Sequence, residues 1–158
     1  MYKIGDQIAH PLHGAGTISA IESRRVNGTN REYDMMHSPV GDMTVMIPTE
    51  TCALIGIRPV IDGERAGDIL ASIPDIEVSD HTNWNKRYRE NMLRLKSGDL
   101  LEVAAVIKSL VYRDKQRGLS TGERKMLHSA KQIFISELVI AQNIAYEEAE
   151  SRLYEAIG

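Results

Sequence analysis

The sequence predicts an α+β protein of two domains, a small antiparallel β-barrel followed by an all-α helical bundle. Three observations lead to this prediction. The chain has 158 residues, which is room for one ordinary domain or two small ones. Short β-branched and apolar runs separated by turn residues fill residues 1–60, whereas apolar residues recur with the helical period after about residue 82. The hydrophobic fraction of 42% and charged fraction of 26% are those of a globular protein and exclude a disordered chain.

The predicted barrel has five short strands. They cover residues 3–10, 16–23, 31–37, 43–48 and 53–59. Asn27 and Gly28 predict a tight hairpin turn, because both residues tolerate the positive φ that such a turn needs. Five strands in so short a segment are too few for a two-sheet sandwich, so we expect a curved barrel of the SH3 or Tudor type over residues 1–60.

The second domain is predicted to span residues 81–158, after a linker over residues 61–80 that contains a short helix at 65–72. Start and stop signals divide it into helices that end near Lys96, Gly118, Asn143 and Ile157. The predicted N-caps are Thr82 or Asn83 for the first, Asp99 for the second, and Ser120 for the third, where Glu123 completes a capping box.

Charge is distributed unevenly along the chain, although the net charge is only -3. Residues 1–80 carry six Lys/Arg against twelve Asp/Glu, and residues 132–158 carry one against five. Residues 81–131 carry twelve against five, a balance of +7. A basic middle in an acidic protein indicates an anionic partner, with nucleic acid as the first candidate. Solvated helix faces with i,i+4 ion pairs are the alternative.

No combination of residues in the sequence is typical of catalysis or metal binding. The five His residues lack the spacing of metal ligands, and the single Cys52 has no basic neighbour in sequence to activate it. We therefore expect neither an enzyme nor a bound cofactor or metal. No apolar run is long enough to cross a membrane and no signal peptide opens the chain, so we expect a cytoplasmic, nucleoid-associated protein that is monomeric.

The segment 82–89 is the strongest indication of a binding partner. Its Trp84, the only tryptophan, lies in the first turn of the predicted helix beside three cations, Lys86, Arg87 and Arg89. One interpretation is that Trp84 anchors the helix to the bundle. The other is an aromatic wedge for the minor groove of DNA, with the cations binding phosphate.

A second pair of cations, Arg124 and Lys125, lies in the first turn of the third predicted helix, where phosphate would also be favoured. Because no residue set resembles a major-groove reader, we expect little sequence preference.

Taken in order, these residues resemble the CarD/CdnL family of bacterial transcription regulators over almost the whole chain. The segments that carry the resemblance are Gly5–Asp6, His10–Gly14, Glu32–Tyr33, Asp42–Val45, Ile47–Pro48, Asn83–Trp84, Arg87–Tyr88, Arg113–Asp114, Gly118–Ser120, Gly122–Leu127 and Ala130–Ile133.

The resemblance implies a Tudor-like N-terminal domain that binds the β subunit of RNA polymerase, with Arg24 and Met46 on the binding edge. It implies a helical domain that contacts promoter DNA at the upstream edge of the transcription bubble. Trp84 would then be the wedge, and Lys86, Arg87, Arg89 and Lys125 would touch the backbone. Met46 departs from the family pattern, since some members have Arg there, and this favours a more apolar contact.

This reading implies a protein that stabilises the open promoter complex. A protein-interaction adaptor without DNA contact is the alternative, and an RNA-binding barrel is a more remote one, because the predicted barrel is acidic and lacks an aromatic platform.

Overall fold

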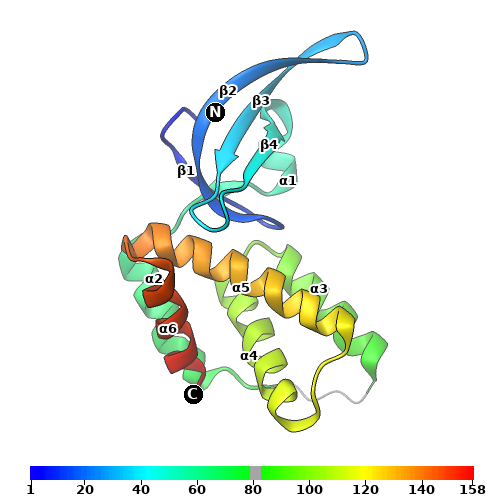
Figure 1. Ribbon diagram of the computed structural model, residues 1–158, viewed down its shortest axis with the longest axis vertical. Helices are drawn as coiled ribbons and strands as arrows, with labels where there is room; N and C mark the ends of the chain where they lie inside the picture. The colour runs from blue at the N-terminus through cyan, green and yellow to red at the C-terminus, as the bar shows by residue number, and fades with distance from the viewer. Residues whose placement is uncertain (79–82) are drawn as a thin grey trace.

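The computed structural model describes residues 1–78 and 83–158. Thr82, one of the two predicted N-caps, lies outside the described residues. The sheet occupies one end of the molecule and the helices the other, with α5 (Thr121–Gln142) running across the helical region directly beside the sheet (Figure 1). No described helix has both the length and the apolar stretch that a membrane crossing needs.

The N-terminal sheet is antiparallel, with the strand order β4-β3-β2-β1-β5. Its strands are β1 (Gln7–His10), β2 (Gly14–Val26), β3 (Thr29–His37), β4 (Thr44–Pro48) and β5 (Arg58–Pro59). The predicted hairpin turn at Asn27 and Gly28 is present, with φ of 52° and 79°. A register shift between Ile18 and Ala20 bends β2, and the curved sheet encloses a small core of Ile8, Ile18, Met36, Ile47, Cys52 and Ile57.

The fifth strand predicted over 53–59 is wrong for most of its length. A 3-10 turn, η1 (Thr49–Thr51), leads into the short helix α1 (Cys52–Ile55), and only Arg58 and Pro59 pair with β1. Gly56 ends the helix with a φ of +96°, and its N–H donates to the carbonyl of Cys52. Pro59 has no N–H for a longer ladder, so the strand stays short.

The helical region contains α2 (Gly63–Ser72), η2 (Ile73–Asp75), α3 (Trp84–Lys96), α4 (Leu100–Arg117), α5 (Thr121–Gln142) and α6 (Tyr146–Ile157). The side chains of Asn83, Asp99 and Ser120 cap α3, α4 and α5, as the sequence predicts. Asn143 ends α5 in the left-handed conformation, with φ of 52°, and the last helix begins at Tyr146.

The segment predicted to be a linker contributes to the core of the helical region. Ala66 and Ile69 of α2, with Ile73 of η2, are buried in the same cluster as Phe134 and Leu138 of α5. The spacing of Ala66, Ile69 and Ile73 explains this burial, because residues three or four apart share a helix face. Residues 63–75 therefore pack as part of the bundle.

Candidate functional site

Trp84 is held at the start of α3 with part of its ring exposed. The indole stacks on Tyr88, one turn later, with ring centroids 4.9 Å apart and planes 17° from parallel. Its Nε1 donates a hydrogen bond to Ser120 Oγ, at 3.2 Å, on the cap of α5. The side chain is nonetheless 42% exposed. Both interpretations of Trp84 therefore describe part of its position, since the ring joins two helices and still presents apolar surface to solvent.

Gly122, in the first turn of α5, lies under the two rings. A Cβ at this position would be 3.7 Å from both Trp84 and Tyr88, which is ordinary van der Waals contact. Farther along the same turn, Lys125 lines a groove of about 260 Å³ together with Tyr88, Met92 and Met126. The fold thus brings Lys125 close to the Trp84–Tyr88 stack, although the two lie about forty positions apart in the chain.

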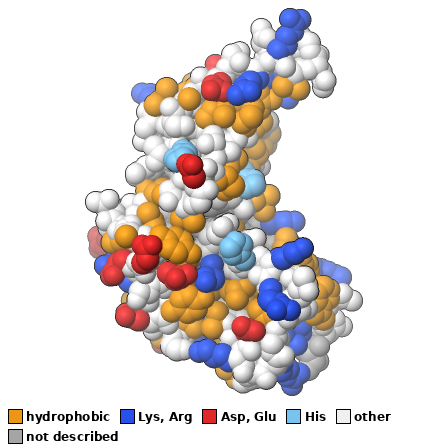
Figure 2. All heavy atoms as spheres, viewed as in Figure 1, with side chains coloured by type: hydrophobic (Ala, Val, Ile, Leu, Met, Phe, Trp, Pro, Cys, Tyr) orange, Lys and Arg blue, Asp and Glu red, His pale blue; other side chains and the backbone are white. Residues whose placement is uncertain are grey.

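Lys86 and Arg89 lie on the outer face of α3. At ~100° per residue, helical geometry directs both away from the side of α3 that carries Tyr88. Both are exposed, as are Arg124 and Lys125 on α5. Figure 2 shows Lys and Arg gathered over the part of the surface where α3 and the start of α5 lie, and Asp and Glu gathered over α2 and α6.

Arg87 lies in a different environment from the other predicted phosphate contacts. It is 6% exposed, and its Nε donates to the Glu123 carboxylate, 2% exposed, at 3.0 Å. Burial alone would raise the pKa of Glu123, but the hydrogen bond and charge of Arg87, with hydrogen bonds from Ser120, hold it below its usual value. The Arg87 side chain is therefore paired with the Glu123 carboxylate inside the helical region, and this pair holds α3 against α5.

Several other cations of the basic middle are also engaged by protein groups. Lys108 donates to the carbonyls of Ile73, Pro74 and Ile76, and Arg113 lies 3.8 Å from Glu123. The charge balance of residues 81–131 consequently overstates the cationic surface that a partner would meet.

The two residues predicted to bind polymerase lie on one face of the sheet. Arg24 of β2 is opposite Arg31 of β3, and Met46 of β4 is opposite Met35 of β3. Since side chains alternate between faces and positions 31 and 35 of β3 share a face, Arg24 and Met46 share it too. This is the outer face, because Met36 and Ile47 of the opposite parity lie in the core.

Both side chains are accessible on that face. Met46 is 43% exposed and belongs to β4, which is at the edge of the described sheet. The Arg24 side chain is 53% exposed and its Nη2 lies 2.7 Å from Glu22 Oε2. Exposed ion pairs of this kind contribute little stability, so a partner carboxylate can compete for the guanidinium.

Cys52 is buried beside Asp34. Burial, followed by the charge and hydrogen bond of Asp34, raises the pKa of the thiol to about 11. The side chain is therefore a neutral thiol at neutral pH, and it packs in the core of the sheet.

These features define a class of protein in which a curved five-stranded sheet is joined to a helical region that presents a partly exposed tryptophan beside cations. Residues 2–61 match the family model described as the CarD-like/TRCF RID domain, and residues 68–154 match the model of the CarD C-terminal domain. A relative in Bacillus subtilis (strain 168), YdeB, named there as a candidate transcription factor, is 34% identical over 151 residues, which are 96% of this chain and 99% of the relative. The chain belongs to the CarD-like family of transcription regulators that interact with RNA polymerase.

Proposed function

We propose that this protein stabilises the open promoter complex by binding the β subunit of RNA polymerase and the upstream fork of the DNA bubble at the same time. The observation that carries the proposal is the position of Trp84. Its ring is fixed by Tyr88 and Ser120, yet 42% of the residue is exposed at the end of a helix whose other side carries Lys86 and Arg89. An apolar ring held in advance loses little conformational entropy when it enters DNA.

The proposed mechanism is differential binding. An apolar wedge in the minor groove unstacks a base step at a cost of about a few kcal/mol. That cost is smaller where the duplex already ends, as it does at a fork. Lys86, Arg89 and Lys125 attract phosphate without reading sequence, and a protein that binds the fork more tightly than closed duplex shifts polymerase toward the open complex.

The outer face of the sheet is the proposed polymerase-binding surface. The edge strand β4 offers backbone groups for pairing with a strand of the β subunit, while Met46 supplies an adaptable apolar contact and Arg24 a charged one. Binding there raises the effective concentration of the helical region at the promoter, so a weak affinity for DNA is sufficient. This function places the protein in the cytoplasm with the nucleoid, as a monomer on each polymerase.

The lifetime of open complexes on an unstable promoter tests the proposal. We expect wild-type protein to lengthen it and Trp84→Ala to remove about nine-tenths of that gain, because the wedge acts only when the fork is open. Tyr112→Ala is the matched control, since Tyr112 is 45% exposed on α4 but lies outside the proposed surface. Affinity for the β subunit should be the same in both variants.

A protein-interaction adaptor would give a different result. In that case wild-type protein would bind polymerase without changing the lifetime, or Trp84→Ala would leave the gain intact. Loss of β-subunit binding in Trp84→Ala would instead show that the indole serves the fold.

A further inference from the structure

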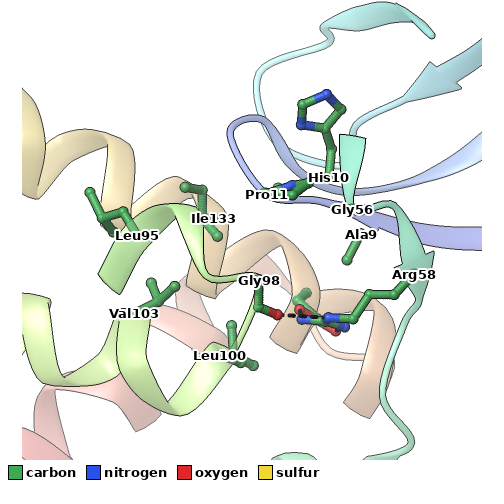
Figure 3. A pocket seen from close by; sticks show the side chains of 12 residues that line it. Ala9, His10, Pro11, Gly56, Arg58, Leu95, Gly98, Leu100, Val103 and Ile133 are labelled. Carbon is green, nitrogen blue, oxygen red and sulfur yellow. Dashed lines mark hydrogen bonds and ion pairs between the residues drawn. The ribbon is translucent and has the colours of Figure 1, made fainter. Parts of the chain in front are cut away.

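The sheet and the helices are joined by an ion pair with a buried carboxylate, and the proposed function does not use this pair. Glu137 of α5 is 1% exposed and forms a bidentate ion pair with Arg58 of β5. Arg58 Nη1 lies 2.6 Å from Glu137 Oε2, and Arg58 Nη2 lies 2.7 Å from Glu137 Oε1. The same carboxylate accepts the N–H of Ile61 at 3.1 Å. Arg58 Nε donates to the carbonyl of Gly98 at 2.8 Å, between α3 and α4 (Figure 3). One arginine of β5 thus contacts both α5 and the turn between α3 and α4.

A second contact lies one residue away on α5. Ser136 Oγ accepts a hydrogen bond from the N–H of Ala15 in β2, at 2.9 Å, and donates to the carbonyl of Ile133 at 3.0 Å. Gly14 approaches α5 so closely that a Cβ there would be 3.1 Å from Ile133 Cα and in collision with Ser136 Oγ. The backbone of β2 therefore packs directly on the helix.

The space between the two contacts is nearly filled. The cavity there measures about 10 Å³ and is lined by Ala9, Pro11, Leu100, Val103 and Ile133, among others. That volume is at or below the minimum a water molecule needs. The packing therefore leaves little room for water beside the Glu137 carboxylate, and a rotation of the sheet on α5 that withdrew Arg58 would leave this buried charge without its cationic partner.

We infer that Arg58, Glu137, Ser136 and Gly14 form an interdomain clamp that fixes the polymerase-binding face of the sheet relative to Trp84. The inference rests on the proposed function. The polymerase-binding face and the DNA-binding surface increase each other's affinity only if their geometry lets both be occupied at the same time. A rigid connection between the sheet and the helices also avoids the loss of conformational entropy that ordering them on the promoter would cost. Arg58 and Glu137 are thus positioning residues, because they touch neither DNA nor polymerase in this account.

Residual dipolar couplings of the full chain test the clamp itself. In wild-type protein, amide couplings from the sheet and from the helices should fit a single alignment tensor. In Glu137→Gln the side-chain NH2 would face the guanidinium donors of Arg58 and break the pair. The couplings of the sheet and those of the helices should then require separate alignment tensors, although each set should still fit its own tensor well. Glu148→Gln is the control, because it removes the exposed pair of Glu148 with Arg152 on α6.

Open-complex lifetime then tests the use of the clamp. We expect Glu137→Gln to lose about nine-tenths of the lifetime gain while its affinity for the β subunit stays within about twofold of wild type. A single tensor in Glu137→Gln would overturn the clamp. Separate tensors with a wild-type lifetime would overturn its role in positioning.

If Glu137→Gln does not fold, Arg58→Lys takes its place. This variant keeps one positive charge beside Glu137 but loses the bidentate pair and the hydrogen bond to the Gly98 carbonyl. If wild-type protein leaves the lifetime unchanged, the proposed function has failed, and the dipolar couplings alone still decide whether the clamp exists.

Discussion

At the scale of single residues, Glu123 connects the fold to the proposed DNA-binding surface. Its carboxylate receives Arg87 from α3 and lies 3.8 Å from Arg113 of α4, while Ser120 Oγ bonds both to it and to the indole of Trp84. The position of Trp84 thus depends on a buried carboxylate that never meets solvent. Arg87, which the sequence predicts to contact phosphate, pairs with this carboxylate and holds the helix that carries Trp84.

This arrangement predicts an acid-sensitive stability. Because the pKa of Glu123 is lower in the folded protein than its ordinary value of 4.5, its contribution is fully present above that value and is lost as the pH falls through the folded pKa. Chemical denaturation between pH 7 and pH 3 measures this loss. We expect Glu123→Gln to be less stable at neutral pH by ~3–5 kcal/mol and to show a flatter acid dependence.

An unchanged stability in Glu123→Gln would contradict the buried pair. Glu102→Gln serves as the control, since Glu102 meets Arg94 in a pair that is more than one-third exposed on both sides and should contribute little.

At the scale of elements, the outer face of the curved sheet carries both residues predicted to bind polymerase, and β4 lies at one edge of the described sheet. The register of β2, β3 and β4 places Arg24 and Met46 on that face with Tyr33 and Met35 between them. The surface therefore comes from three strands acting together, and no single turn or loop defines it.

We expect Arg24→Glu to weaken binding to the β subunit about tenfold, because a reversed charge meets a surface arranged for a cation. Titration of the β subunit with the full chain measures the affinity, and circular dichroism should show unchanged helices. Arg65→Glu on α2 makes the same charge change away from the sheet face. Equal affinity of Arg24→Glu and wild type would remove Arg24 from the interface.

At the scale of the whole molecule, a protein of net charge -3 is proposed to bind DNA with one part of its surface. Seven of the cations in residues 81–131 are exposed on α3, α4 and α5 and have no ion pair among the described residues: Lys86, Arg89, Lys96, Lys115, Arg117, Arg124 and Lys125. Acidic α2 and α6 lie on the other side of the helical region (Figures 1 and 2).

Salt dependence of DNA binding measures how many of these cations meet phosphate. We expect Lys86→Ala, Arg89→Ala and Lys125→Ala each to reduce the slope of log K against log salt by about 0.9. Arg152→Ala on α6 should leave the slope unchanged. A slope that none of the three variants alters would place the DNA elsewhere.

The sequence predicted what is local and missed what depends on distant partners. The caps at Asn83, Asp99 and Ser120 and the turn at Asn27–Gly28 follow from bonds within a few residues, and all are present. Arg87 is predicted to contact phosphate from its position beside Trp84, whereas its buried side chain pairs with Glu123, 36 residues away, and local spacing does not reveal such a partner. Glu137 is a sequence signal for a distant contact, because a lone acid beside wholly buried residues such as Ile135 and Leu138 requires a partner. That partner is Arg58.

A titration can decide whether Trp84 distinguishes an open fork from closed duplex. Trp84 is the only tryptophan, so the intrinsic fluorescence of the free protein reports on this one ring. We would titrate the protein at low salt with forked DNA and with fully paired DNA of equal length. We expect the fork to quench the fluorescence at about tenfold lower concentration than the paired DNA does. Equal quenching by the two DNAs, or none with either, would contradict this expectation.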